Sequence, residues 1–523
     1  MSAPAVIPAV TVEMDGLRLA ESDVRSMGEV RVYQALSLPT VCELAFYEPE
    51  GAVVGAAAVG PGTALRIRVE GLDPFLFEGE LTAVEYDYGP GGERRVYMRG
   101  YDMLHRLRKR QPVRSHVQVN FVELARTLVS DLGFSVSTVD PGPVWQELFQ
   151  YGQSDLDLLA EIGERCGQYF TLRGSALHLT TLDGFGTALP LELGAALIEA
   201  RVEINAETAC RIVEARGWDP HRATPVVGSA SRARIGRNVP AAVFPEQVGG
   251  LPRRTLVDTP VQEDLHAEGI AQAELDRRAA REVVFRGIAE GDARLRPGTP
   301  VDVSGVAPHL AGRYVLTAVR HIIDRRKGYV SELDTSPPPG RFHARGTSAT
   351  LGVVSRVDDP EGMGRVRVVL PNYGDVEAGW FNVVSPGAGP GKGMMALPDV
   401  NDRVLVVLIN GDPAQGVVIG GLYSLSAPLD TGVSDGAVRR FSVMTPGGLR
   451  VRLDDETKTV DVENGEGDRI AMSPEEILMA DSRGSHITLS TGKCRIVSTA
   501  DLDISAPGRK VTISGNHIDF ERS

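Results

Sequence analysis

The C-terminal run "DLDISAPGRKVTISGNHIDF", Asp501 to Phe520, decides the fold. Its apolar residues alternate with polar ones, and Gly508 and Gly515 punctuate the run. Alternation with a period of two is typical of β-strands that have one apolar face, and glycine favours the turns between strands. We therefore expect short strands and tight turns throughout this run.

The same unit recurs upstream as an internal repeat. Gly448, Gly467, Gly484 and Gly508 are each followed, three and five residues later, by two apolar residues, and each copy continues with a second alternating strand. The side chains predicted to share one inward face, and so to form the core of the unit, are Val451, Leu453, Val460, Val462, Ile470, Met472, Ile477, Met479, Ile487, Leu489, Ile496, Leu502, Ile504, Val511, Ile513, Ile518 and Phe520. Burying them would contribute about 25 to 50 kcal/mol in gross terms, at roughly 1.5 to 3 kcal/mol each.

A single ribbon of this kind has no means of covering its apolar face. The sequence shows no amphipathic helix after it, and an exposed ribbon of this length would aggregate through its edges. Three ribbons wrapped around a threefold axis would point every apolar face inward and give every strand a neighbour. The sequence therefore predicts an intertwined trimeric β-helical needle over residues 441–523. The alternative is an ordinary single-chain β-solenoid, whose repeats should be more regular and should carry end caps.

Composition and charge exclude several classes of protein. The 523 residues are 42% hydrophobic and 24% charged, and the net charge is -14. A general binder of nucleic acid or of membrane surfaces would need a basic field, so we expect no nucleic-acid partner. The basic stretch "RLRKRQPVR", Arg106 to Arg114, is interpreted as a solvated rim or a subunit contact in preference to a phosphate site. Cys42, Cys166, Cys210 and Cys494 lie too far apart in sequence to suggest a zinc site or a disulfide framework, and are expected to be reduced and packed.

Upstream of the needle, the pattern is mainly β with small α+β insertions. Two helices are expected near the middle of the first half: one capped by Asn120 and stopped by Gly133, the other capped by Ser154 and stopped by Gly167. A third helical stretch is expected from about Pro260 to Val284. The predicted organisation is a first hub β-barrel domain at 1–110, an α/β hub segment at 111–194, a second hub β-barrel domain at 195–335, a linker at 336–350, an OB-fold domain at 351–425, a linker at 426–440 and the needle at 441–523.

The N-terminus lacks a basic region followed by a continuous apolar stretch, and no run in the chain approaches 18 apolar residues. We therefore expect no signal peptide and assembly in the cytoplasm, within a particle that is released or acts on a target envelope.

Four stretches resemble the VgrG family, the trimeric spike of type VI secretion systems, and its relatives in contractile phage tails and extracellular contractile injection systems. "RGYDMLHRLRK" (99–109) and "YGQSDLDLLAEIGERCGQYFTLRGSALHL" (151–179) are similar to the hub of that family. "VVSRVDDPEGMGRVRVVLP" together with "GDPAQGVVIGGLYS" (411–424) resembles its OB-fold, and the tail is similar to its needle. The resemblance implies two barrel-like hub domains that mimic subunits of an inner tube.

The resemblance also implies the partners. They are two further copies of the chain in a homotrimer, the inner tube protein, other baseplate components and a PAAR-like tip protein, with effector cargo as an optional further partner. Contact with the target membrane would be transient. The function implied is that of a central hub-spike, a homotrimer that caps the inner tube and pierces the target envelope when the sheath contracts.

Signals for catalysis are weak. "GVSDG", Gly432 to Gly436, matches the serine-hydrolase pattern around Ser434, but it lies in a predicted linker without the strand and helix that the nucleophile turn requires. "GPGKG", Gly389 to Gly393, lacks the remaining residues of a phosphate loop. His309, His321 and His343 are too scattered for metal spacing. The sequence therefore predicts a non-catalytic protein with no catalytic or metal site and no cofactor; the alternative is a phage-tail-type baseplate hub with cell-wall hydrolase activity.

Overall fold

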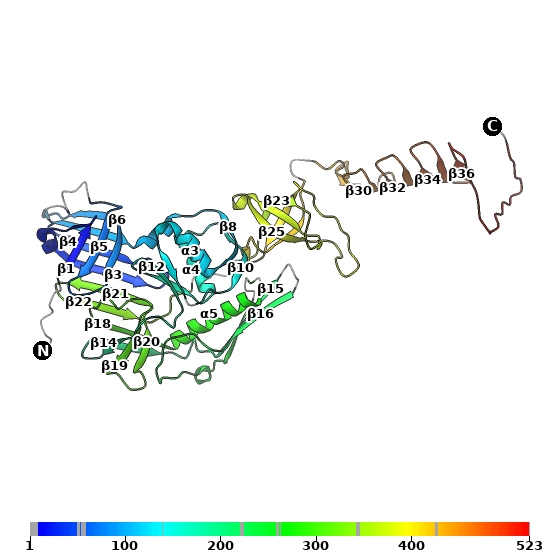
Figure 1. Cartoon of the computed structure of the whole chain (residues 1–523). Coiled ribbons are helices and arrows are strands. Elements are labelled where there is room, and N and C mark those ends of the chain that lie inside the picture. The colour runs from blue at the N-terminus through cyan, green and yellow to red at the C-terminus, as the bar shows by residue number, and fades with distance from the viewer. Residues whose placement is uncertain are drawn as a thin grey trace. The chain divides into compact units, whose positions relative to one another are not determined.

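The computed structural model describes residues 9–49, 53, 59–138, 140–219, 224–257, 261, 263–340, 346–423 and 427–521. It divides into two compact units, Met1–Leu422 and Tyr423–Ser523. We call the second the ribbon unit, and each unit is described by itself (Figure 1). The mainly β prediction is confirmed, because strands dominate both units and the helices found among the described residues all lie in the first.

An 11-stranded sheet organises the first unit, with the strand order β14-β18-β22-β21-β3-β4-β7-β6-β5-β1-β2. Its strands are β1 (Val10–Met14), β2 (Leu17–Arg18), β3 (Met27–Ala35), β4 (Val41–Tyr47), β5 (Ala64–Val69), β6 (Phe77–Tyr88), β7 (Arg94–Tyr101), β14 (Leu197–Ile204), β18 (Val283–Glu290), β21 (Ala318–Asp324) and β22 (Gly328–Asp334). A short helix, α1 (Glu21–Ser26), precedes β3. The sheet therefore combines strands from both predicted hub domains, 1–110 and 195–335.

The two hub regions keep separate cores although they share this sheet. One core is centred on Val32, Phe46 and Ile67, and the other on Phe285 and Tyr314. The two regions meet where β21 pairs with β3, in an antiparallel register that runs from Ala318 opposite Ala35 to Asp324 opposite Glu29. The hub is thus two lobes joined through one sheet.

The predicted α/β segment has its own core, which the predicted helices cover. In α3 (Phe121–Val129) the Asn120 side chain accepts a hydrogen bond from the Glu123 N–H, and in α4 (Asp155–Arg165) Ser154 accepts one from the Asp157 N–H. Both predicted N-caps are therefore confirmed. The remaining elements of this segment are the turns η1 (Met103–Lys109) and η2 (Ser130–Leu132) and the strands β8 (Arg114–Asn120), β9 (Ser135–Ser137), β10 (Val144–Gln150), β11 (Tyr169–Arg173) and β12 (Ala176–Thr180).

The third predicted helix is α5 (Asp264–Glu282), which packs on the sheet β16-β15-β17. The predicted start of this helix at Pro260 lies outside the described residues. The elements around α5 are β13 (Leu189–Glu192), β15 (Ile212–Asp219), β16 (Thr224–Ala230), η3 (Pro245–Val248), β17 (Arg253–Leu256), β19 (Pro300–Ser304) and β20 (Gly312–Val315).

The predicted OB-fold is confirmed as a closed five-stranded barrel with the order β23-β24-β25-β27-β26. Its elements are β23 (Ser348–Arg356), β24 (Val366–Leu370), η4 (Pro371–Tyr373), β25 (Val376–Val383), β26 (Arg403–Leu408), η5 (Ile409–Gly411) and β27 (Gly416–Gly421). The Tyr151 hydroxyl of the α/β segment donates a hydrogen bond to the Gly411 carbonyl at 2.7 Å, and its ring packs edge-on against Tyr373 at 5.1 Å. The barrel is thus attached to the hub by the tyrosine that opens the "YGQSD" motif.

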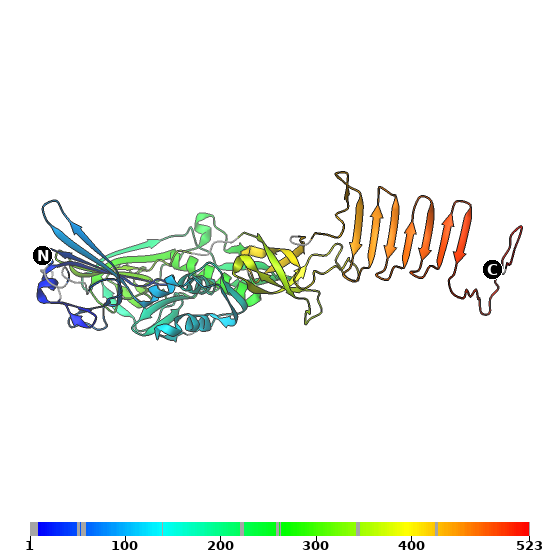
Figure 2. The same ribbon diagram turned by 90° about the horizontal axis from the view of Figure 1, so that it is seen from above.

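The ribbon unit begins with a tight hairpin and continues as a ladder of seven strands (Figure 2). The hairpin joins β28 (Val433–Ser434) to β29 (Ala437–Val438), and the ladder is β30 (Arg440–Met444), β31 (Arg450–Asp454), β32 (Thr459–Glu463), β33 (Arg469–Met472), β34 (Glu476–Ala480), β35 (His486–Ser490) and β36 (Lys493–Val497). The strands expected within Asp501 to Phe520 are not present, so that expectation is wrong for the single chain. A strand needs a hydrogen-bonded neighbour, and the chain offers this segment none among its described residues.

Candidate functional site

The seven strands of the ribbon unit place apolar residues directly opposite one another. Each strand runs antiparallel to the next, so Cα partners lie on the same face of the sheet. The first row is Val443, Val451, Val462, Ile470, Met479, Ile487 and Ile496. The second row is Phe441, Leu453, Val460, Met472, Ile477, Leu489 and Cys494. We call these fourteen residues the apolar face.

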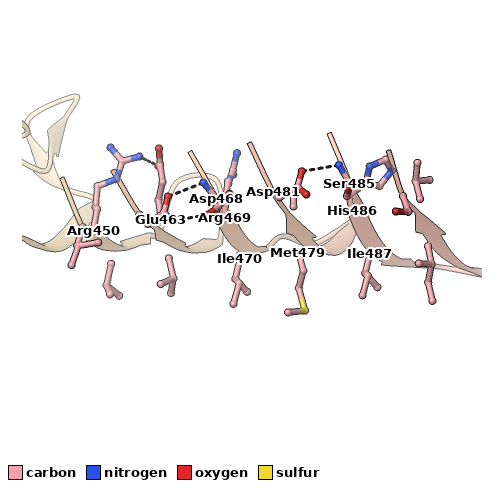
Figure 3. Close-up of a pocket in the computed structure, with 18 of the residues that line it drawn as sticks. Arg450, Glu463, Asp468, Arg469, Ile470, Met479, Asp481, Ser485, His486 and Ile487 are labelled. Atoms are coloured by element: carbon pink, nitrogen blue, oxygen red, sulfur yellow. Dashed lines mark hydrogen bonds and ion pairs between the residues drawn. The ribbon is translucent and has the colours of Figure 1, made fainter. Parts of the chain in front are cut away.

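The apolar face is open to solvent within the single chain. Exposure in the first row runs from 39% for Ile487 to 61% for Val443, and Phe441 in the second row is 59% exposed. A groove of about 720 Å³ follows the first row and the adjoining turns. Figure 3 shows Ile470, Met479 and Ile487 pointing to one side of the sheet, while Glu463 and Asp481 lie on the other. Contiguous exposed apolar surfaces are typical of interaction sites.

The opposite face of the same sheet is charged and internally paired. Asp461 is 2% exposed, and its carboxylate accepts hydrogen bonds from Arg452 at 2.8 Å and from Arg469 at 2.7 Å. Desolvation raises the pKa of Asp461, but the two guanidinium groups outweigh it and leave the pKa below its usual value. Arg450 pairs with Glu463 in the same layer. These pairs link β31, β32 and β33, so they fix which side of the ribbon faces water.

Other carboxylates of the ribbon unit are also held by donors of the chain itself. Asp430 pairs with Arg440 at 2.7 Å, and that hydrogen bond lowers the pKa of Asp430. Asp454 accepts from two backbone N–H groups at 3.0 Å, and Asp468 accepts from the Ser482 N–H at 2.9 Å. Backbone hydrogen bonds lower the pKa of both Asp454 and Asp468.

The turns along one edge of the ladder repeat the same hydrogen-bond design. Oδ1 of Asn464 accepts from the backbone N–H groups two and four residues later at 2.9 and 2.8 Å, and Oδ1 of Asp481 does the same at 2.9 and 2.8 Å. Gly448, Gly467 and Gly484 close these turns with φ of +84°, +93° and +101°. This backbone region favours glycine, so the glycine spacing seen in the sequence marks real turns.

The structure brings together most of the predicted needle-core residues. The eleven from Val451 to Ile496 all belong to the apolar face. Leu502, Ile504, Val511, Ile513, Ile518 and Phe520 lie after the last strand and are exposed. Sequence reasoning missed Phe441, Val443 and Cys494, of which Cys494 is exposed and not packed as expected. The alternation of Phe441 with Val443 could have identified this strand in the sequence. No glycine lies three residues before Phe441, however, as the repeat requires.

The weak catalytic signals do not form a site. Ser434 lies in the β28–β29 hairpin, where Asp435 and Gly436 have φ of 49° and 74°, as a two-residue turn of the I′ type requires. The described structure has no helix after it, so the nucleophile turn of a serine hydrolase is not present here. Lys392 of the "GPGKG" stretch forms a backbone bridge with Gly389 in a loop. His321 is fully buried, and His343 lies outside the described residues.

Three of the five basic side chains in the stretch Arg106 to Arg114 pair with carboxylates of the same chain. Arg106 pairs with Glu80 at 2.6 Å, Arg110 with Asp131 at 2.5 Å and Arg114 with Asp155 at 2.9 Å. These arginines are therefore neutralised within the hub. The described residues include no group of three or more His, Cys, Asp and Glu side chains arranged for a metal ion. None of their helices has the length and apolar character that a membrane crossing demands.

Comparisons with solved structures give the same fold. The Escherichia coli protein c3393, described as a component of the type VI secretion system with structural similarity to the bacteriophage T4 tail proteins gp27 and gp5, matches with a TM-score of 0.54 at 13% identity, over 79% of this chain and 99% of that one. The lidless Francisella PdpA-VgrG complex matches with a TM-score of 0.51 at 8% identity, over 94% of this chain and 98% of that one. The half-lidded complex gives 0.51 at 9% identity, over 93% and 87%. The predicted VgrG-like fold is confirmed.

No curated protein sequence matches this chain. Two family models match parts of the chain. Residues 350–423 match the type VI secretion system/phage-baseplate injector OB domain, which supports a structural hub-spike role. Residues 56–325 match the Alg8 N-terminal domain, and this match covers more than half of the 523 residues. The protein therefore belongs to the Alg8 N-terminal domain family and carries an injector-type OB domain behind it.

Proposed function

We propose that this chain is the central hub-spike of a contractile injection system. In this role it forms a homotrimer that caps the inner tube, contacts other baseplate components and carries a PAAR-like protein at its tip. Contraction of a sheath would drive the assembly forward, and the needle would pierce the target envelope. The role is structural and non-catalytic, and effector cargo is an optional addition. The assembly would form in the cytoplasm, within a particle that is released or acts on the envelope.

The apolar face is the observation that carries this proposal. Each of its strands contributes two inward residues, which span about 7 Å along the strand. Stacked sheets lie about 10 Å apart. If two ladders packed face to face, each apolar face would be a strip narrower than this separation, and the sides of both strips would stay open to water. Three strips arranged around an axis enclose a triangular core and cover all three faces. The geometry therefore favours a trimer over a two-sheet sandwich.

The same arrangement accounts for mechanical stiffness. In the ladder, every internal strand is hydrogen-bonded on both sides, and the paired charges of the opposite face would point to solvent. Closing three ribbons around a dry core adds side-chain packing along the length of the ladder. A rod of this kind resists bending because bending requires hydrogen bonds or packed contacts to be broken.

The first test is the native mass of the purified full chain. Three chains of 56.1 kDa give about 168 kDa by light scattering. A monomer whose apolar face is covered by its own residues would refute the proposal. A second test is a binding experiment with the purified inner tube protein of the same system, in which the trimer should cap tube ends when it is viewed by electron microscopy.

The alternative of a baseplate hub with hydrolase activity gains no support from the described residues. Ser434 lies in the β28–β29 hairpin, and no acid or histidine among the residues that the structure describes is hydrogen-bonded to it. An assay of cell-wall hydrolysis with the wild-type chain and a Ser434→Ala variant decides between the two. Equal absence of activity in both supports the structural role.

A further inference from the structure

The sequence contains two Asn–Gly pairs, Asn410–Gly411 and Asn464–Gly465. Asparagine is chemically labile in proteins, and it is most reactive before glycine, which has no side chain to hinder its backbone nitrogen. That nitrogen attacks the side-chain carbonyl carbon of the asparagine, and ammonia leaves. The two pairs of this chain have different surroundings, so the structure determines which of them can react.

Asn464 begins the turn between β32 and β33, and the following residues hold its side-chain amide. Oδ1 accepts hydrogen bonds from the backbone N–H groups of Glu466 at 2.9 Å and of Asp468 at 2.8 Å. Negative charge develops on this oxygen when the carbonyl carbon is attacked, and two fixed N–H donors stabilise that charge. The turn therefore activates the amide toward the reaction.

The attacking group is the backbone nitrogen of Gly465. Within the residues that the structure describes, no acceptor takes a hydrogen bond from its N–H. Gly465 and Glu466 are exposed, so water reaches the turn. A Cβ at position 465 would lie 2.6 Å from the Gly447 carbonyl oxygen of the preceding turn. Close packing of the two turns thus requires a glycine directly after Asn464.

A neighbouring repeat shows that aspartate fits at this position. Asp481 occupies the equivalent place in the turn between β34 and β35, and its Oδ1 accepts from the N–H groups of Arg483 at 2.9 Å and of Ser485 at 2.8 Å. Oδ1 of Asn464 likewise accepts from the residues two and four positions later. Conversion of Asn464 to aspartate would therefore preserve both hydrogen bonds of the turn.

One contact of Asn464 would be lost in the conversion. Nδ2 donates to Oδ2 of Asp468 at 2.7 Å, and an aspartate side chain has no such donor. The product would place two carboxylates side by side and add one negative charge to each chain. An isoaspartate product would also lengthen the backbone of the turn, so it should disturb the register of β32 with β33.

Asn410 lies in the opposite kind of environment. It is 8% exposed and belongs to η5 of the OB barrel. The carbonyl of the next residue, Gly411, accepts a hydrogen bond from the Tyr151 hydroxyl at 2.7 Å. Deamidation needs both movement of the backbone toward the side chain and access of water, so burial and this hydrogen bond should protect Asn410.

We propose that Asn464–Gly465 is a site of spontaneous deamidation in the folded chain. The Gly465 nitrogen forms a bond to Cγ of Asn464, the Cγ–Nδ2 bond breaks, and the proton of the Gly465 nitrogen leaves with Nδ2 as ammonia. A water molecule then opens the succinimide ring and yields aspartate or isoaspartate. No enzyme or oxidant takes part. The inference concerns the ribbon unit alone and does not rest on the proposed function.

The test follows both Asn–Gly pairs while the purified full chain is incubated for weeks at neutral and at mildly alkaline pH. Mass spectrometry of peptides, digested in acid to stop the reaction, reports the replacement of NH2 by OH at each asparagine. The Asn464 peptide should convert several-fold faster than the Asn410 peptide. Its rate should rise with pH, because the attacking nitrogen must lose its proton. No conversion of Asn464, or equal rates for both pairs in the folded chain, would overturn the inference.

A second measurement separates the effect of the structure from that of the sequence. When urea unfolds the chain, the two pairs should react at similar rates, because neither the turn nor the barrel remains. A difference that persists in urea would show that the local sequence sets the rates, and the inference would then be wrong.

The matched variants are Asn464→Asp and Asn464→Ser. Asn464→Asp carries the charge of the product, so fresh variant should elute with aged wild-type chain in ion-exchange chromatography. Asn464→Ser keeps an oxygen acceptor at the start of the turn but has no amide to lose, so it should age without the charge shift. A shift of equal size in Asn464→Ser would place the reaction elsewhere in the chain and refute the assignment.

Discussion

Replacing Ile487 by aspartate should prevent assembly of the ribbon unit. Ile487 is 39% exposed and lies between Met479 and Ile496 in the first row of the apolar face. Complete burial of an isoleucine contributes about 1.5 to 3 kcal/mol, so covering the remaining two-fifths contributes about 0.6 to 1.2 kcal/mol per chain and about 2 to 4 kcal/mol per trimer. Aspartate forfeits this gain and also brings three carboxylates into the core.

The charge effect is the larger of the two. Desolvating an unpaired ion costs several kcal/mol, so three carboxylates should cost on the order of 10 kcal/mol per trimer, well above the lost apolar burial. We expect the light-scattering mass at micromolar concentration to fall from about 168 kDa to the 56.1 kDa of one chain. The matched control is Thr488→Asp, because Thr488 points to the opposite face and should leave the mass unchanged. A stable Ile487→Asp trimer, or equal dissociation of both variants, would refute the reasoning.

Three further outcomes are expected. Burial holds the pKa of His321 at about 3, below its usual 6.5. The stability that neutral His321 contributes should therefore be complete above pH 6.5 and should decrease by about 1.4 kcal/mol per pH unit as the pH falls toward 3. Chemical unfolding should show a weaker acid dependence for His321→Gln than for the wild type, and equal slopes would contradict the assignment. Tyr151→Phe removes the hydrogen bond to Gly411 but keeps the ring against Tyr373. The contact between hub and barrel should lose about 0.5 to 1.5 kcal/mol of stability, so proteolysis between them should accelerate accordingly. An unchanged rate would show that this hydrogen bond does not hold the barrel. Gly467→Ala places a Cβ where φ is +93°, so it should lower the stability of the ribbon by about 1 kcal/mol in thermal unfolding. The comparison is Gly447→Ala, because this glycine lies outside the positive-φ region and an added Cβ there meets no atom closer than 4.0 Å.

Local signals in the sequence predicted local structure well. Asn120 and Ser154 act as N-caps because each side chain satisfies an N–H only three residues away, which is a relationship that the sequence displays directly. The glycine repeat likewise marked turns whose backbone requires positive φ at Gly448 and Gly484. Periodicity then placed the apolar side chains of the ladder on one face.

Non-local pairing could not be predicted in the same way. The junction of β21 with β3 joins residues almost 300 positions apart, such as Arg320 and Tyr33, and neither strand carries a signal that names its partner. The ion pairs of Asp461 depend on two other strands and became visible only in the register of the sheet. The prediction of strands within Asp501 to Phe520 was wrong for a related reason. Alternation shows that a segment can form a strand, but it does not show that a neighbouring strand is present.

The low pKa values of four carboxylates in the ribbon unit determine how its charge responds to acid. Asp430, Asp454, Asp461 and Asp468 all have pKa values below their usual range, because arginines or backbone N–H groups of the same chain hold them in the ionised form. Mild acid would therefore not change their charge. A structure that passes from one compartment into another can meet a different pH there. The four carboxylates would keep the same negative charges in both compartments.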